Sequence, residues 1–370
     1  MTTFTPHQDE ALKRVANWLA NKPANMRAQE QVFRLFGYAG TGKTTLAQHI
    51  AAHVDGDVKF AAFTGKAALV MKAKGCDGAS TIHSLIYRPR DINDEVPSFE
   101  LWDDAPASKA RLIIIDECSM VDTELGRDLL SFGVPVLVLG DPAQLPPIQG
   151  AGFFTESAPD AMLTEVHRQA QDDPIVRLSM DVREGRALEH GRYGESDIVA
   201  RRDLDPDRVM RTDQILVGRN ATRRAYNGRM RERLGMSEAL PIAGDKLVCL
   251  RNNRKKGLFN GGLWSVRQRA VSKSGIVTMR IDSDDGSNNK LVKVSVRSEC
   301  FAGGIEDLAW EARRKYDEFD YGYALTVHKA QGSQWDDVVL FDESFAFPEH
   351  RARWLYTGIT RAAKRLTIVM

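Results

Sequence analysis

The run GYAGTGKT at 37–44 constrains this chain more than any other part of its sequence. It has the spacing G-x-x-x-x-G-K-[ST], follows an apolar run at 32–36 and opens a helical pattern at 44–54, the context that a phosphate-binding loop requires. Glycines let the backbone wrap an anion, and amide groups at a helix N-terminus face phosphates. The loop therefore predicts a nucleoside triphosphate site formed by Gly37, Ala39, Gly40, Thr41, Gly42, Lys43, Thr44 and Thr45.

Acidic residues follow a second apolar run, LIIIDE at 112–117. A carboxylate at the end of a buried strand can hold Mg²⁺, so we expect Asp116 and Thr44 to hold the metal and Glu117 to polarise the attacking water. A third run, VLVLGDPAQLPPI, places Asp141 and Gln144 just beyond another strand, where ligands of open α/β sheets bind. Gln144 is suited to sense the γ-phosphate. These residues predict magnesium-dependent hydrolysis of the triphosphate.

The chain reads as two α/β domains with insertions. Residues 1–150 alternate strand-like runs with helical stretches, the pattern of a parallel sheet covered by helices on both faces. Within them, the proline-containing stretch 88–110 interrupts the pattern and predicts a small excursion. Apolar and polar residues alternate from 244 to 301, so we expect a small β-barrel at 244–318. This barrel would be inserted into a second α/β domain formed by 151–243 and 319–370.

The composition argues against several classes of site and partner. The 370 residues carry 51 Lys and Arg against 50 Asp and Glu, so net charge does not indicate a partner. Four widely spaced cysteines without a Cys-x-x-Cys pair suggest neither a zinc site nor a disulfide framework. The longest apolar runs are shorter than the roughly 20 residues that a membrane helix needs. We therefore expect a cytoplasmic protein with no membrane partner.

Six motifs occur in a specific order: the 37–44 loop, IIIDECSM (113–120), GDPAQLPPI (140–148), LTEVHRQ (163–169), YALTVHKAQGSQWD (323–336) and WLYTGITRAAKRL (354–366). Together they resemble the motif set of superfamily 1 DNA helicases, and within it the RecD/Dda-like group of superfamily 1B. The resemblance spans almost the whole chain. It implies two RecA-like P-loop domains with ATP in the cleft between them, a pin insertion at 88–110 and an SH3-like β-barrel at 244–318.

The resemblance also implies residue roles. Arg168 and Arg361 match the family's γ-phosphate arginines, and a planar guanidinium suits a transferring phosphoryl group. Gly332 is similar to a glycine near the γ-phosphate, and Gln8 resembles the glutamine that reads adenine. An exposed glutamine at a helix start is the alternative for Gln8.

Contacts with DNA are implied by further motifs. AAFTGKAAL (61–69), ASTIHSL (79–85) and the 323–336 motif resemble the family's strand-binding motifs and nominate Thr64, Lys66, His83, Thr326 and His328. Their hydroxyl, ammonium and imidazole groups suit sequence-independent phosphate contacts.

In the excursion, Pro89 and Phe99 resemble the bracing proline and base-stacking aromatic of the pin. Trp102 is the alternative aromatic, and packing at the root of the hairpin is the alternative role.

The expected function is an ATP-dependent 5′-to-3′ DNA helicase that binds single-stranded DNA and duplex junctions and needs Mg²⁺. We expect a monomer acting in replication, recombination or repair, with proteins of those pathways as partners. Two alternatives stay open: an RNA or RNA/DNA translocase, because phosphate contacts do not discriminate sugars, and a nucleotide-switched module that binds single strands.

Overall fold

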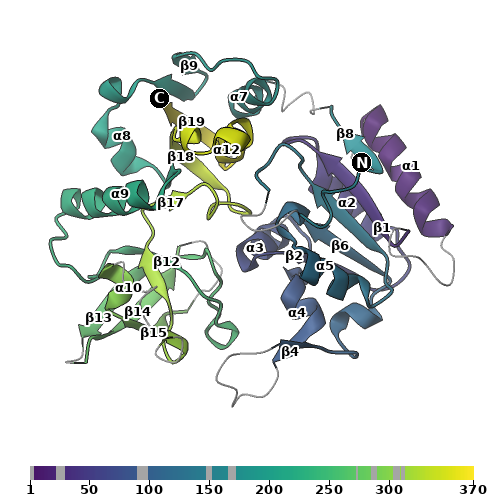
Figure 1. The fold of residues 1–370 in the computed structure, drawn as a ribbon, viewed down its shortest axis with the longest axis horizontal. Helices are drawn as coiled ribbons and strands as arrows, with labels where there is room; N and C mark the ends of the chain where they lie inside the picture. Colours follow the sequence, from purple (N-terminus) through teal and green to yellow (C-terminus); the bar gives the residue numbers. More distant parts are fainter. Residues whose placement is uncertain are drawn as a thin grey trace.

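The computed structural model describes residues 4–21, 30–89, 99–146, 152–165, 172–271, 274–284, 290–302, 309 and 313–370. Two α/β domains lie side by side, and a unit built on an antiparallel β-sheet is attached to the second of them (Figure 1). The α/β fold class predicted from the sequence is confirmed. Among the described residues, no helix is long and apolar enough to cross a membrane.

The first domain contains a six-stranded parallel sheet with the order β3-β2-β6-β7-β1-β8. Its strands are β1 (Val32–Gly37), β2 (Val58–Ala62), β3 (Ser80–Thr81), β6 (Leu112–Asp116), β7 (Val136–Gly140) and β8 (Ala161–Leu163). Nearly every residue of β6 and β7 is buried, as expected for strands covered on both faces. Strand β8 pairs with β1, so this sheet extends beyond 150, where the sequence placed the domain boundary.

The described part of the first domain contains five α-helices, and α1 shows how the sequence sets a helix start. In α1 (Pro6–Ala20), Thr5 and Gln8 form a capping box, and Pro6 occupies the first turn. Ala11 and Val15, four residues apart, bury one face of α1. The others are α2 (Lys43–Ala52), α3 (Gly65–Ala73), α4 (Ile82–Ile86) and α5 (Thr123–Leu130).

The predicted excursion begins with a two-stranded antiparallel ribbon. Strands β4 (Tyr87–Pro89) and β5 (Phe99–Leu101) pair with Pro89 opposite Phe99, and a short 3₁₀ turn follows at Pro106–Lys109. The ribbon projects from the edge of the first domain below α4 (Figure 1). For Pro89 and Phe99 the backbone alone is described.

The second domain contains a sheet with the order β17-β11-β18-β19-β10-β9. Strands β10 (Ser196–Val199), β11 (Gln214–Val217), β17 (Ala324–Thr326), β18 (Trp335–Phe341) and β19 (Ala362–Val369) are parallel, and the edge strand β9 (Gly191–Tyr193) is antiparallel to β10. Its longer helices are α7 (Pro174–Arg183), α8 (Pro206–Arg211), α9 (Asn220–Arg233) and α12 (Arg351–Ile359).

The insertion is an antiparallel five-stranded sheet with the order β15-β14-β13-β12-β16. It comprises β12 (Lys246–Cys249), β13 (Leu263–Val271), β14 (Ile276–Ser283), β15 (Val292–Arg297) and β16 (Phe319–Tyr321), with the short helix α10 (Glu299–Ala302). Val292, Val294 and Val296 are buried while Lys293 is exposed, which matches the period-two pattern. Because β16 pairs with β12, this sheet continues past the expected end at 318.

Candidate active site

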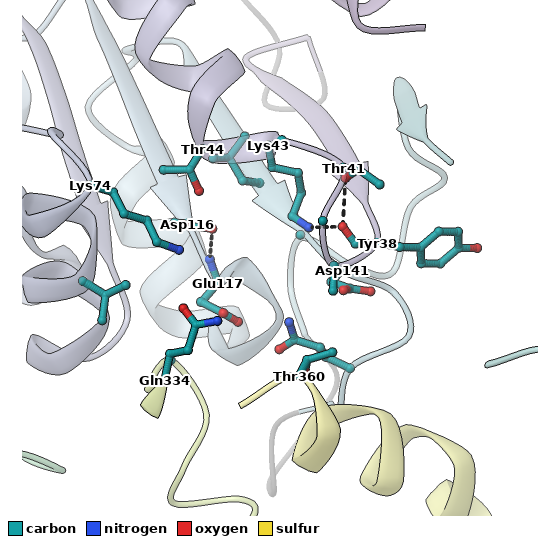
Figure 2. Close-up of a pocket in the computed structure, with 18 of the residues that line it drawn as sticks. Tyr38, Thr41, Lys43, Thr44, Lys74, Asp116, Glu117, Asp141, Gln334 and Thr360 are labelled. Atoms are coloured by element: carbon teal, nitrogen blue, oxygen red, sulfur yellow. Dashed lines mark hydrogen bonds between the residues drawn. The ribbon is translucent and has the colours of Figure 1, made fainter. Parts of the chain in front are cut away.

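A cleft of about 350 Å³ separates the two α/β domains. The first domain contributes the loop after β1 and the carboxyl ends of β6 and β7, while the second contributes the turn before β18 and the end of α12. Figure 2 shows the side chains of Lys43 and Glu117 reaching into this space from one side and those of Gln334 and Thr360 from the other. Its lining includes the predicted residues Ala39, Gly40, Thr41, Gly42, Lys43, Thr44, Thr45, Asp116, Glu117, Gln144, Gly332 and Arg361.

The loop at 37–44 has the shape of an anion cradle. Gly40 and Gly42 adopt φ angles of 76° and 81°, a left-handed conformation that favours glycine. The Lys43 ammonium donates to the carbonyl oxygens of Gly37 at 2.6 Å and Tyr38 at 3.0 Å. Since α2 begins at Lys43, its first amide groups face the same space. The cradle can therefore bind a polyphosphate, with Lys43 turning from the loop carbonyls to phosphate oxygens.

Two adjacent carboxylates lie opposite Lys43. Burial raises the pKa of Asp116, as does the neighbouring Glu117 charge, while Lys43 opposes the shift. Glu117 has a φ of 53°, and among the described residues it alone combines a side chain with a positive φ. Such backbone strain is concentrated at functional sites, where the surrounding structure holds it. Here it turns the Glu117 carboxylate into the cleft (Figure 2).

Gln144 carries a buried amide oxygen that has no partner in the described part of the chain. The residue is 9% exposed and lines the cleft. A buried polar atom without a hydrogen bond costs free energy, so a ligand or water in the cleft is its natural partner. This agrees with the predicted role of Gln144 beside the γ-phosphate.

Arg361 reaches the cleft from the second domain. Its guanidinium donates to the Thr357 and Ser333 carbonyl oxygens at 3.1 and 3.2 Å. It also lies 3.9 Å from a carboxylate oxygen of Glu117. The residue is 5% exposed, so this cation is held in a fixed position with the Glu117 carboxylate in front of it. The predicted nucleotide groups of the two domains thus meet at one point.

A buried tyrosine joins the domains at the phosphate loop, and the sequence did not single it out. The Tyr356 hydroxyl of α12 donates to Asp141 at 2.7 Å and accepts from the Ala39 amide at 2.9 Å. Burial raises the pKa of Asp141, and the hydrogen bond from Tyr356 opposes that shift. This hydroxyl therefore couples the position of α12 to the loop at 37–44.

Tyr356→Phe is expected to lower kcat/KM for ATP hydrolysis by about tenfold, because a buried carboxylate and a loop amide lose a charge-assisted partner. Steady-state kinetics would measure it. The control is Tyr193→Phe, which removes an exposed hydroxyl that donates to the Glu189 carbonyl of the same domain. Unchanged kinetics in Tyr356→Phe would show that the link does not position the loop.

Three further cleft residues were also missed. The side chains of Lys74, Gln334 and Thr360 face the cleft (Figure 2). Gln334 and Thr360 lie inside the motifs at 323–336 and 354–366, so their place in these motifs could have indicated that they line the cleft. Lys74 follows α3 and belongs to no motif; its cation enters the cleft through the packing of α3 alone.

The predicted contact of Gln8 with adenine stays a prediction. Gln8 is 2% exposed, its amide donates to the Thr41 carbonyl at 3.0 Å, and its oxygen accepts from the Thr5 amide. The residue supports the phosphate loop from beneath and does not line the cleft, and it is not the exposed glutamine of the alternative. Gly37 lies outside the lining too, and its carbonyl holds Lys43. Arg168 lies outside the described residues.

The residues predicted to bind DNA have varied surroundings. The Thr64 hydroxyl caps α3 by accepting from the Ala67 amide, and Lys66 is 6% exposed in a cavity between α3, the insertion and the second domain. Thr326 is mostly buried, His83 is exposed, and burial, together with His350, lowers the pKa of His328. Their contacts with a strand stay predictions.

Comparisons with known proteins agree with this geometry. Residues 21–203 match the AAA domain family, and residues 321–369 match the UvrD-like helicase C-terminal domain. The ATP-dependent RecD2 DNA helicase of Deinococcus radiodurans is 29% identical over 90% of this chain, and the ATP-dependent DNA helicase Pif1 of Bdellovibrio bacteriovorus is 24% identical over 85%. The ATP-dependent DNA helicase dda of Enterobacteria phage T4 is 33% identical over 40%. These matches support a superfamily 1B helicase of the RecD/Pif1-like group.

Solved structures show the same fold. A Pif1 helicase from Bacteroides in complex with ADP-AlF3 and ssDNA matches 99% of this chain and 92% of its own, with a TM-score of 0.58 and 18% identity. Pif1 from Candida albicans matches 100% of the chain and 95% of its own, with a TM-score of 0.54 and 17% identity. The chain spans 46% of RecD2, 37% of Dda and 78% of the Bdellovibrio Pif1.

Proposed function

We propose that this chain is an ATP-dependent helicase that moves 5′-to-3′ along single-stranded DNA and unwinds duplex DNA. One observation supports this most strongly: a buried arginine of the second domain, Arg361, faces the strained Glu117 of the first across a phosphate cradle. An ATPase that needs both domains for turnover links each hydrolysis event to a relative movement of the domains. The names of RecD2, Dda and Pif1 point to the same activity.

In hydrolysis, Lys43 and the first amides of α2 would bind the β and γ phosphate oxygens. Glu117 would orient the attacking water and accept its proton, Gln144 would contact the γ-phosphate, and Arg361 would stabilise the charge that develops on it. Arg168 is proposed as a second arginine of this kind. Gly332 would bring the backbone of the second domain close to the γ-phosphate.

Mg²⁺ fits the same residues. The described residues contain no cluster of three or more His, Cys, Asp or Glu side chains that would cage a metal. Mg²⁺ in nucleotide sites needs fewer protein ligands, because phosphates and waters supply the rest. Thr44 and Asp116 would hold it, and the ion would neutralise charge on the β and γ phosphates.

The strand would lie across both domains on Thr64, Lys66, His83, Thr326 and His328. Thr64 of the first domain and Gly332 of the second are already neighbours, since a Cβ on Gly332 would lie 3.3 Å from the Thr64 hydroxyl. A nucleotide that moves the Gly332 turn would therefore also move the start of α3. We propose that this contact connects ATP to the strand-binding residues.

The β4–β5 ribbon is proposed as the pin that separates the strands, and the five-stranded sheet as an SH3-like unit that supports it. The insertion contacts the first domain elsewhere: the Phe259 ring packs on Gly65, where a Cβ would lie 2.5 Å from a ring carbon. This contact places the loop between β12 and β13 beside the start of α3, close to the proposed path of the strand.

Phe99→Ala is expected to reduce the rate of strand displacement by about tenfold, because base–aromatic stacking contributes roughly 1–3 kcal/mol per base. ATP hydrolysis stimulated by single strands should be retained. Trp102→Ala, which removes a 36% exposed aromatic from the same excursion, is the comparison. Displacement that is unchanged in Phe99→Ala and reduced in Trp102→Ala would assign the stacking role to Trp102.

The experiment that tests the proposed function is ATP hydrolysis with oligo-dT, with oligo-U and without nucleic acid. We expect strong stimulation by oligo-dT. Stimulation by oligo-U alone would favour an RNA translocase, since sugar-specific contacts then decide binding. Slow hydrolysis that neither oligonucleotide stimulates would favour a nucleotide-switched binding module.

A further inference from the structure

A second cavity, of about 630 Å³, lies in the second domain and shares no lining residue with the nucleotide cleft. It is formed by α8, α9, the segment at 201–204 and the end of β18. In Figure 1, α8 and α9 lie on the side of the second domain that is turned away from the first. A ligand here would leave the nucleotide cleft open.

The floor of this cavity is apolar. Leu204, Val209, Met210 and Met230 line it together with the Phe341 ring, which is 1% exposed. On α9, the exposed Ala221 and Ala225 are one turn apart and also line it, and their small side chains leave the space open. Methionines adapt to ligands of different shape. The floor is therefore suited to an inserted aliphatic or aromatic side chain.

The rim of the cavity is cationic. Arg201, Arg229 and Arg233 are exposed, and the described residues place no acidic group within ion-pair distance of any of them. The Arg201 guanidinium lies 5.8 Å from the centre of the Phe341 ring, and that of Arg229 lies 5.9 Å from the centre of the Tyr226 ring. Arg229 and Arg233 are four residues apart on α9, so they lie on one side of the opening.

The single acidic residue among the described lining residues does not offset this charge. Glu343 is 3% exposed, and its carboxylate accepts from the amides of Gly218 and Arg219, the Arg219 guanidinium and the Thr222 hydroxyl. Burial alone would raise the pKa of Glu343, yet these hydrogen bonds lower it. Glu343 thus neutralises Arg219 and leaves the other three cations without a carboxylate partner among the described residues, although Arg201 also hydrogen-bonds the Tyr226 hydroxyl.

We propose that this cavity binds an acidic peptide segment of a partner protein, with one apolar side chain on the floor and carboxylates on the arginines. Nucleic acid fits less well. The Phe341 ring is 1% exposed and packs on the Tyr226 ring at 4.4 Å, so it is not accessible to a stacking base. The Arg229 guanidinium lies 5.9 Å from the centre of the Tyr226 ring and competes with a base for that ring. Thr222 and Glu343, the polar groups near the floor, already bond to each other at 2.7 Å and offer little to base edges.

The test is fluorescence anisotropy with a labelled peptide in which one phenylalanine is flanked by three aspartates on each side, without ATP or DNA. We expect saturable binding that salt weakens, and about tenfold weaker binding when alanine replaces the phenylalanine. The double variant Arg229→Glu with Arg233→Glu, and Ala225→Phe, which fills the cavity, should each weaken binding by about tenfold. The matched control is Arg224→Glu, an exposed arginine of α9 that does not line the cavity.

ATP hydrolysis of each variant should equal that of the unmodified chain, which verifies folding without using the cavity. Peptide binding that does not saturate, or that survives both the double variant and Ala225→Phe, would overturn the proposal. Oligo-dT that displaces the peptide, and binds less well to both variants, would also overturn it by assigning the cavity to nucleic acid. Because no nucleotide is present, these results are independent of the helicase assignment.

Discussion

Lys43→Ala lowers kcat for ATP hydrolysis by about 100- to 1,000-fold, the range expected when a fixed donor to a developing phosphate charge is removed. The ammonium already sits between the Gly37 and Tyr38 carbonyl oxygens at the mouth of the cradle, so little rearrangement is needed to reach phosphate. Alanine keeps the helical start of α2 but leaves the cradle without its cation. Single-turnover hydrolysis with saturating MgATP measures the effect on chemistry directly.

The control for this variant is Lys13→Ala, which removes an exposed ammonium from α1. Both variants should show the far-ultraviolet circular dichroism of the unmodified chain, because the Lys43 ammonium bonds only to carbonyl oxygens of its own loop among the described residues. Turnover in Lys43→Ala equal to that of the unmodified chain would contradict the nucleotide site.

Arg361→Ala is expected to lower kcat by about 1,000-fold or more while nucleotide still binds, since an arginine supplied to the γ-phosphate is worth that much in phosphoryl transfer. Arg361 belongs to the second domain, whereas we expect the first domain to supply most of the contacts that bind ATP. Its loss should therefore leave ATP binding in place and nearly abolish turnover, which needs both domains. Arg361→Lys keeps the charge but loses the planar fork, and we expect it to recover only a small part of the rate.

A buried arginine also stabilises its surroundings, so a control must separate the two effects. Arg353→Ala removes an exposed guanidinium from α12, and its turnover should be unchanged. Thermal unfolding with and without nucleotide would show whether Arg361→Ala still folds and binds. Nucleotide binding together with an unchanged kcat would refute the role of Arg361 across the cleft.

Local motifs predicted most of the cleft because their geometry is encoded within a few residues. Gly40 and Gly42 give the phosphate loop its shape. Asp116 is the last residue of β6, after the apolar residues 112–115, and Glu117 follows it directly. Arg361 could be placed by its motif alone, although 244 residues separate it from Glu117 and only the packing of two domains brings them together.

Contacts between distant segments account for what the sequence did not reveal. In the sequence, nothing distinguishes Tyr356 from the other aromatic residue of α12. Its hydrogen bond to Asp141 depends on how that helix packs across the cleft. The predicted domain boundaries at 150 and 318 differ from the observed ones because β8 pairs with β1 and β16 pairs with β12. No local sequence pattern specifies these long-range pairings. Gln8 was matched to adenine by resemblance, and that contact stays a prediction. Its hydrogen bonds with Thr5 and Thr41 depend on how α1 packs against the phosphate loop.

The most direct test of the central proposal is strand displacement with excess ATP and Mg²⁺, on matched duplexes that carry either a 5′ or a 3′ single-stranded tail. We predict that only the 5′-tailed duplex opens, and that Lys43→Ala opens neither. Opening of the 3′-tailed duplex alone would contradict the proposed direction, and opening of neither by the unmodified chain would contradict the helicase function.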